Sequence, residues 1–194
     1  MTTTSPKSAT ASAHDRELLR GRAGRLRAIA HSPENAERKR FWYKHNALQS
    51  ERPMILAFPE GGWGEILTLA DCRCEDEDLR RWEYSMRTKL YTLETIRDDQ
   101  TVEPWFDINW RVHASNYGVE IPMVHGDNRG SYIWDPPIKD LERDLEKLRP
   151  RQFSVDRAGT LRDLDRAQAI FGDLLPPRLR GGFDGLQDVV DEGL

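Results

Sequence analysis

The stretch that decides the expected fold is Arg52-Pro53-Met54-Ile55-Leu56-Ala57-Phe58-Pro59. Its apolar side chains form a continuous run, which is typical of a strand covered on both faces in a parallel sheet or barrel. The loop Glu60-Gly61-Gly62-Trp63-Gly64-Glu65 follows at the carboxyl end of this predicted strand. Ligands of α/β folds bind at that end because the loops converge there. The sequence therefore predicts an interior strand that opens into a ligand site.

The loop after the predicted strand carries polar and stacking chemistry. Glu60 and Glu65 are candidate catalytic groups, as acid–base residues or polar anchors, and Trp63 is a candidate wall for a planar ligand. The glycines match neither the phosphate-binding P-loop nor the dinucleotide fingerprint. A plain strand-to-helix turn is the alternative interpretation of this loop.

Two further candidate ligand-binding residues lie later in the chain. Trp105 falls in a strand-like segment, where an indole either lines a pocket or closes a small core. His125 lies at the edge of a predicted hairpin turn, and its imidazole suits acid–base work near neutral pH. No spacing ties this histidine to a nucleophile or a metal, so a bystander role is the alternative.

Helical and β-like patterns alternate on both sides of the predicted strand. Apolar residues at three- and four-residue spacing predict a helical extension over residues 14–52, whose second helix opens with Ser32 as cap and Pro33 in the first turn. The remaining predicted elements are a helix over 75–96, a strand over 101–106, a hairpin of 119–124 with 131–134, a short helix over 139–148, a helix over 159–171 and a strand over 174–182. Residues 1–13 and 183–194 are predicted to be flexible tails. This order favours an α/β fold.

Composition narrows the classes of partner. The 194 residues carry a net charge of −4, and no apolar run approaches the roughly 20 residues that a membrane span needs, so we expect no membrane partner and a cytoplasmic location. Residues 1–52 hold 11 Lys and Arg against 5 Asp and Glu. A basic arm for nucleic acid would interleave aromatic residues with these charges. Since the arginines instead accompany a helical apolar stripe, we expect a solvated helix face and no nucleic-acid partner.

The two cysteines and the acidic run after them do not predict a metal site. Cys72 and Cys74 are separated by one residue, so a disulfide between them would be strained. A structural zinc site needs a second pair of ligands. The acidic residues 75–78 suit the start of the following helix. We therefore expect neither a metal nor a cofactor.

Several short segments, taken in order, resemble the amino-terminal half of the uroporphyrinogen decarboxylase-like superfamily. The similarity extends over about Arg16 to Arg180 and is carried by Ser32-Pro33-Glu34-Asn35, Trp42-Tyr43-Lys44-His45-Asn46, Arg52-Pro53-Met54-Ile55-Leu56, Phe58-Pro59-Glu60-Gly61, Glu103-Pro104-Trp105, Trp134-Asp135-Pro136-Pro137-Ile138-Lys139-Asp140, Leu145-Glu146-Lys147-Leu148 and Phe171-Gly172-Asp173. The resemblance implies N-terminal helices followed by a (β/α)8 TIM barrel over residues 53–182, incomplete here and interrupted by a β-hairpin insertion.

The same resemblance frames the expected function. The superfamily includes tetrapyrrole decarboxylases and methyltransferases that work with corrinoid proteins, so the chain is expected to be a truncated or fragmentary relative that binds a planar or methylated small molecule. True uroporphyrinogen decarboxylases place arginines after the first strand, where residues 58–65 here hold two acids and no arginine. That departure argues against uroporphyrinogen as the substrate. The alternative is a non-catalytic binding or assembly module that pairs with a completing chain or with its own copy.

Overall fold

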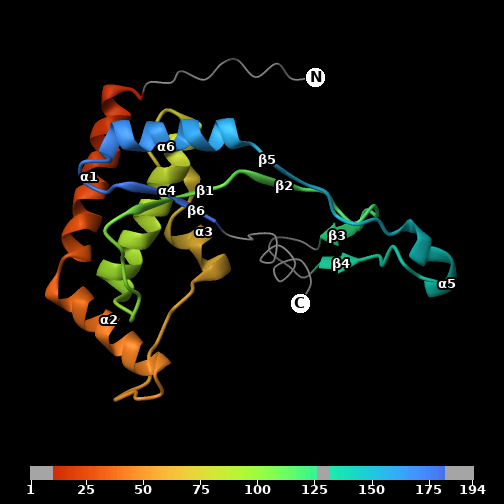
Figure 1. Cartoon of the computed structure of the whole chain (residues 1–194), viewed down its shortest axis with the longest axis horizontal. Coiled ribbons are helices and arrows are strands. Elements are labelled where there is room, and N and C mark those ends of the chain that lie inside the picture. The colour runs from red at the N-terminus through yellow and green to blue at the C-terminus, as the bar shows by residue number, and fades with distance from the viewer. Residues whose placement is uncertain (1–10, 126–131, 182–194) are drawn as a thin grey trace. The chain divides into compact units, whose positions relative to one another are not determined.

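The computed structural model describes residues 11–125 and 132–181 (Figure 1). The chain divides into two compact units: residues 1–108 with 161–180 form the first, and residues 109–160 with 181–194 form the second. The helices are α1 (Ala13–Ala30), α2 (Pro33–Asn46), α3 (Trp63–Ile66), α4 (Glu77–Tyr91), α5 (Leu141–Asp144) and α6 (Arg157–Phe171). The strands are β1 (Phe106–Asn109), β2 (Val112–Ala114), β3 (Met123–His125), β4 (Tyr132–Trp134), β5 (Phe153–Val155) and β6 (Pro177–Arg180). The predicted tails fall almost wholly outside the described residues.

The two N-terminal helices begin where the sequence predicts. In α1 the Ser12 hydroxyl accepts the Asp15 N–H at 3.1 Å, and in α2 the Ser32 hydroxyl accepts the Asn35 N–H at 3.1 Å. Pro33 takes the first turn of α2, where its missing N–H removes no helical hydrogen bond. These caps satisfy amide groups that a helix start otherwise leaves unpaired. The prediction of two helices in residues 14–52 is confirmed.

The acidic run is a helix cap, also as predicted. Asp76 lies at the start of α4, and its carboxylate accepts the N–H groups of Asp78 and Leu79. The helix continues through a π turn over Thr92–Ile96 and ends at Arg97, which has left-handed backbone geometry. The predicted helix over 75–96 is therefore confirmed nearly along its whole length.

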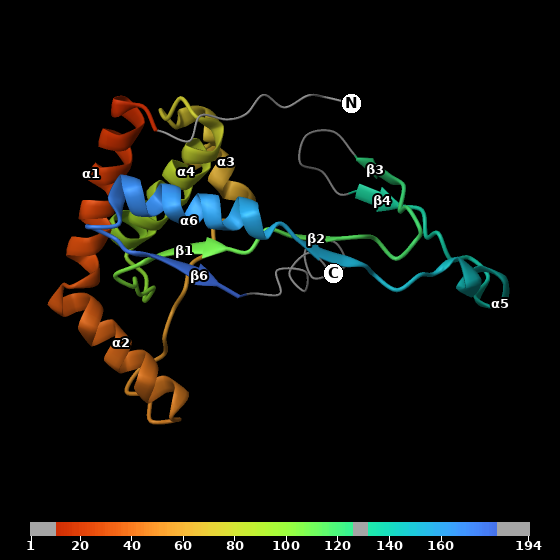
Figure 2. The ribbon, with the colours of Figure 1, turned by 45° about the horizontal axis from the view of Figure 1, so that its top comes forward.

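The first unit has a helical core completed by the late segment of the chain. Helices α1 and α4 pack side by side (Figures 1 and 2), and α6 brings Phe171 against them. The ring of Phe171 lies edge-to-face with Phe106 at 5.2 Å and with Trp82 at 6.1 Å between centroids. This aromatic trio joins α4, β1 and α6, so residues before and after the second unit share one core.

The strands form three separate two-stranded sheets, β1–β6, β2–β5 and β3–β4. In Figure 2 the arrows of β1 and β6 point the same way. The other two pairs are antiparallel. The β3–β4 pair confirms the predicted hairpin, and β6 confirms the predicted strand over 174–182. The fold of the described residues is thus mixed helix and sheet, of α/β type, and shows no complete barrel.

The prediction of an interior strand at residues 52–59 is wrong. The segment forms no strand, and the side chains of Ile55 and Phe58 are 62% and 68% exposed. Its backbone is paired with the loop after α4, because Ile55 accepts the Asp99 N–H at 2.9 Å and donates its own N–H to the Asp99 carboxylate at 2.8 Å. The Arg52 guanidinium hydrogen-bonds the same carboxylate and lowers the pKa of Asp99 to about 2. The Asp99 carboxylate thus accepts a backbone N–H that the carbonyl of a neighbouring strand would otherwise accept.

The predicted strand over 101–106 lies later than expected, because β1 begins only at Phe106 and ends at Asn109. Val102 has both backbone groups engaged by the buried Asn35, whose amide accepts its N–H at 3.0 Å and donates to its carbonyl at 2.9 Å. Pro104 has no N–H to donate. Strand pairing therefore begins after this region, where the Phe106 N–H donates to the Pro176 carbonyl at 3.0 Å.

The second unit lacks an apolar core of its own among its described residues. Only Gly159 and Thr160 are buried between residues 109 and 160 in the described part. The strand pairs β2–β5 and β3–β4 and the short helix α5 leave large apolar side chains exposed, including Val124 at 71%, Ile133 at 75% and Leu141 at 73%. Isolated two-stranded hairpins are marginally stable in water. This unit therefore has apolar surface available to a partner.

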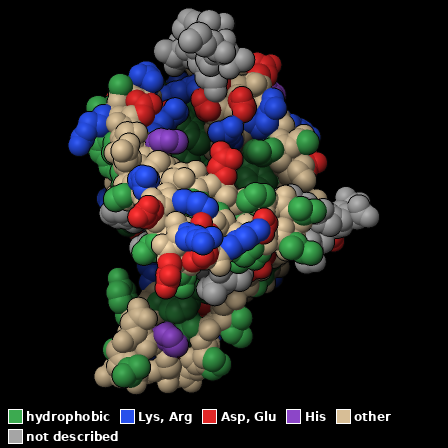
Figure 3. Space-filling view, turned by 90° about the vertical axis from the view of Figure 1, so that its right-hand side faces the viewer, with side chains coloured by type: hydrophobic (Ala, Val, Ile, Leu, Met, Phe, Trp, Pro, Cys, Tyr) green, Lys and Arg blue, Asp and Glu red, His purple; other side chains and the backbone are tan. Residues whose placement is uncertain are grey.

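Within the described part of the chain, no helix combines the length and apolarity needed to cross a membrane. On the face seen in Figure 3, lysine and arginine side chains lie beside aspartates and glutamates, with hydrophobic side chains between them. That face offers charges of both signs, which differs from the basic stripe typical of nucleic-acid binding.

Candidate functional site

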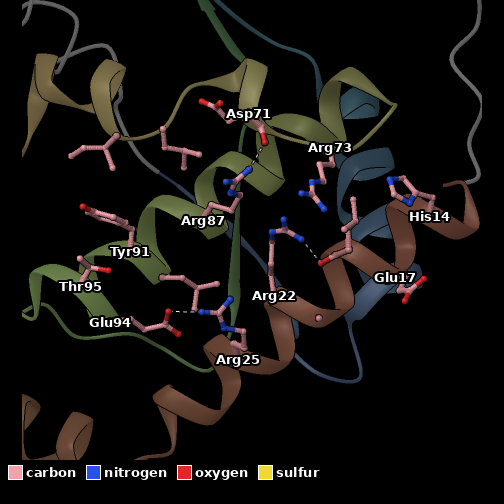
Figure 4. Close-up of a pocket in the computed structure, with 15 residues that line it drawn as sticks. His14, Glu17, Arg22, Arg25, Asp71, Arg73, Arg87, Tyr91, Glu94 and Thr95 are labelled. Carbon is pink, nitrogen blue, oxygen red and sulfur yellow. Dashed lines mark hydrogen bonds and ion pairs between the residues drawn. The ribbon is translucent and has the colours of Figure 1, made fainter.

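A cavity of the first unit lies between α1 and the α3–α4 region and has a volume of about 960 Å³ (Figure 4). Its lining residues are His14, Glu17, Leu18, Gly21, Arg22, Arg25, Ile66, Leu67, Asp71, Arg73, Arg87, Leu90, Tyr91, Glu94 and Thr95. The volume is in the range of small-molecule sites. Four arginines among these residues set the chemistry of the pocket.

Three of the arginines lie in the same part of the pocket. Figure 4 shows the guanidinium groups of Arg22 on α1 and Arg73 before α4 facing each other, while that of Arg87 on α4 turns toward Asp71. Arg22 is ion-paired to Glu83 at 2.6 Å, and Arg87 lies 3.8 Å from the same carboxylate. Among the residues that the structure describes, the Arg73 side chain has no hydrogen-bond or ion-pair partner. Arg22 and Arg87 thus share one fully buried acid, and the Arg73 guanidinium faces Arg22.

Glu83 is the buried acid that pairs with Arg22 and lies near Arg87. Its side chain has no exposed surface, and its carboxylate accepts the backbone N–H groups of Arg73 at 2.8 Å and Cys74 at 2.7 Å. Burial acts to raise the pKa of Glu83, but these hydrogen bonds and the charge of Arg22 outweigh it, so the pKa lies below its ordinary value. The acid is therefore ionised and holds the segment before α4 in place.

Three other charged groups of the pocket have partners of their own. Arg25 on α1 pairs with Glu94 beyond α4. The Asp71 carboxylate accepts the N–H and the hydroxyl of Thr68, both at 2.7 Å, and these bonds lower the pKa of Asp71. Its backbone carbonyl accepts from Arg87. Glu17 on α1 also lines the pocket and has no hydrogen-bond or ion-pair partner among the described residues, so Arg73 and Glu17 are the charged lining groups without a partner.

The cysteines beside the pocket are structural. Cys72 and Cys74 are both buried and free of a disulfide. Burial raises the pKa of each thiol, and Glu83 adds to the effect. A thiol with a raised pKa is a poor nucleophile and a poor metal ligand. No group of three metal-ligating side chains occurs within residues 11–125 and 132–181.

A second, smaller cavity of about 370 Å³ contains Trp63. It lies on another face of α4, and its lining residues are Ala57, Phe58, Pro59, Trp63, Tyr84, Ser85, Thr88, Lys89, Thr92 and Gln100. The indole of Trp63 also meets the ring of Tyr91 edge-to-face at 5.9 Å. Trp63 is the member of the predicted site that lines a cavity in the structure.

The structure places the other predicted site residues apart from these cavities. Glu60 and Glu65 are exposed and line neither cavity. Trp105 is stacked under the Arg178 guanidinium, 4.0 Å from the ring centroid. His125 ends β3 in the second unit, and its side chain lies outside the described part. The structure therefore does not bring the two glutamates and Trp63 into one pocket.

Sequence reasoning missed the arginine cluster, although one signal of it is visible. Leu79, Glu83, Met86 and Leu90 share the buried stripe of α4. A glutamate at a core position of an amphipathic helix must find cationic or amide partners, because an unpaired buried charge is costly. The buried position of Glu83 therefore predicts a basic residue nearby. Which basic residue this is depends on how α1 packs against α4.

Comparison with known proteins adds no relative: no family model, no curated protein and no solved structure matches this chain.

Proposed function

We propose that the chain is a binding module for a small anionic ligand, and that the ligand occupies the pocket between α1 and α4. The observation that carries this proposal is that the Arg73 guanidinium, which has no partner among the described residues, faces Arg22 in a pocket that Arg25 and Arg87 also line. Guanidinium groups bind carboxylates and phosphates through paired N–H donors. An anion placed between Arg22 and Arg73 would give the Arg73 guanidinium a partner that the described chain does not provide.

The three arginines have different roles in this proposal. Arg22 and Arg87 are oriented by Glu83, which fixes part of their geometry before a ligand arrives. Arg73 has no such partner in the described chain and is the group with its donors available. A phosphate monoester fits this arrangement better than a monoanion because two negative charges meet three positive groups. Apolar contacts from Leu18 and Leu90 on the wall suit an organic substituent.

Calorimetric titration of the full chain tests the proposal with phenyl phosphate, benzoate and benzyl alcohol. We expect affinity to fall in that order, and Arg73→Gln to weaken phenyl phosphate binding about tenfold, as loss of one charge-assisted hydrogen bond implies. The matched control is Arg81→Gln on α4, because Arg81 is exposed and pairs with Glu77 outside the pocket. Equal affinity for benzyl alcohol, or equal effects of the two variants, would contradict the anion site.

We also propose that this module is related to the uroporphyrinogen decarboxylase-like superfamily. In this proposal residues 53–182 correspond to an incomplete barrel. What supports it is that β1, the β3–β4 hairpin, α6 and β6 follow in the expected order. A decarboxylase or methyltransferase activity is proposed for an intact relative. Adding a cobamide and a methoxylated aromatic compound to the titration series tests this: binding of either supports the kinship, and binding of neither speaks against it.

A second candidate function is assembly with another copy of this chain through the second unit. The exposed apolar side chains of β3, β4 and α5 favour it, and so does charge, because residues 109–160 hold 8 basic and 8 acidic residues. A neutral surface does not repel its own copy. The two-stranded ribbons also leave strand edges that can pair with another chain.

Light scattering on the full chain tests the assembly. We expect a dimer or larger species, and we expect Ile133→Glu on β4 to shift the protein to a monomer, because a charge on the exposed apolar face opposes its burial. Glu142→Lys on α5 is the control for a surface change that leaves apolar area intact. A monomeric wild-type chain would remove this candidate.

A further inference from the structure

The cavity that contains Trp63 also contains an unusual lysine. Lys89 projects from α4 into a space bounded by Phe58, Trp63 and Tyr84. Its residue is partly buried, and no hydrogen bond or ion pair to the Lys89 ammonium occurs among the described residues. A lysine in such a position is exceptional, since desolvating an ammonium without a partner is costly. This group lies apart from the arginine pocket and has no part in the anion site.

The acids near Lys89 are already paired with other cations. Glu103 binds Lys39 at 2.8 Å, and Asp107 binds Arg180 at 3.3 Å. Both acids act to raise the pKa of Lys89 and Arg180 acts to lower it, but burial is the largest effect, and the net pKa lies below its ordinary value. The amine is therefore more readily deprotonated than an exposed lysine.

We infer that Lys89 is a nucleophilic amine whose cavity captures a small aromatic aldehyde or ketone as an imine. The apolar rings of Phe58 and Trp63 provide a wall for an aromatic carbonyl compound, and the cavity volume of about 370 Å³ accommodates one. Lysines desolvated in apolar pockets are the type that forms such adducts. In this proposal Trp63 lines the ligand cavity, and the reactive amine beside it comes from α4.

The proposed step needs no oxidant or reductant. The lone pair of the neutral Lys89 amine attacks the carbonyl carbon, and a carbinolamine forms as the nitrogen loses one proton to solvent and the oxygen takes one from solvent. The hydroxyl group then takes a second proton and leaves as water, and the nitrogen loses its remaining proton as the carbon–nitrogen double bond forms. Hydrolysis reverses the sequence, so the adduct is a reversible covalent form of binding.

Trapping with benzaldehyde and sodium cyanoborohydride tests the inference on the full chain at pH 7. Cyanoborohydride delivers hydride to the imine carbon, which leaves a stable benzyl group that peptide mass spectrometry locates. The chain has six lysines, and we expect Lys89 to be labelled about tenfold faster than Lys139, which is 66% exposed. Lys89→Arg should remove that label and leave labelling of Lys139 unchanged.

A second variant separates the cavity from the amine. Trp63→Leu removes the aromatic wall and keeps Lys89, so we expect slower labelling of Lys89 and unchanged labelling of Lys139. Circular dichroism confirms that each variant keeps its helices. Labelling of Lys89 no faster than Lys139, or unaffected by Trp63→Leu, would overturn the inference. Because phenyl phosphate binding is measured separately, failure here leaves the anion site standing.

Discussion

Replacement of Glu83 with alanine is expected to lower the free energy of unfolding by about 3 to 5 kcal/mol, as removal of one partner from a buried ion pair does. The variant leaves the Arg22 guanidinium without its acid and two backbone N–H groups, those of Arg73 and Cys74, without an acceptor. Urea denaturation followed by circular dichroism measures the change. The same variant should abolish phenyl phosphate binding, because Arg22 and Arg87 lose the carboxylate that orients them.

The control for this variant is Glu77→Ala on the same helix. Glu77 is 65% exposed and pairs with Arg81 one turn away, so its loss should cost about 0.5 kcal/mol or less.

The effect of Glu83→Ala should also depend on pH. Since the folded pKa of Glu83 lies below its ordinary value of 4.5, its stabilisation is present above that pH and is lost as pH falls through the folded value. A difference between variant and wild type that stays constant down to pH 2 would contradict this account.

Replacement of Phe171 with alanine is expected to cost about 3 to 5 kcal/mol, the usual range for a buried phenylalanine. The side chain has no exposed surface and contacts the rings of Phe106 and Trp82. The loss should appear in the unfolding of α1 and α4 as well as α6, because all three share this core. Thermal unfolding followed by helical circular dichroism measures it.

The matched control on α6 is Leu161→Ala. Leu161 is 46% exposed, and surface substitutions of this kind change stability by about 0.5 kcal/mol. If Phe171→Ala proved as mild as Leu161→Ala, α6 would not be part of the first unit's core.

Local signals in the sequence identified most helices and their starts. Ser32 followed by Pro33 predicts the beginning of α2 because capping depends on residues within one turn. The cap at Asp76 is likewise encoded by neighbours in the chain. These features need no knowledge of how distant segments pack.

The failures concern interactions between distant segments. The run 54–58 has the composition of a buried strand, but burial requires a cover, and the structure supplies instead the carboxylates of Asp98 and Asp99 as acceptors for its amides. The arginine pocket likewise depends on α1 packing against α4, which brings Arg22 to Glu83 across 61 positions of sequence. In both cases the sequence showed which chemical groups are present, but it did not show which distant residue would pair with them.

The most direct test of the anion site is a crystal structure of the chain grown with phenyl phosphate. We predict density for the phosphate among Arg22, Arg73 and Arg87, with its oxygens within hydrogen-bond distance of the Arg73 guanidinium. Full occupancy of phenyl phosphate at another place, with Arg73 still unpartnered and the pocket holding no anion, would contradict the proposal.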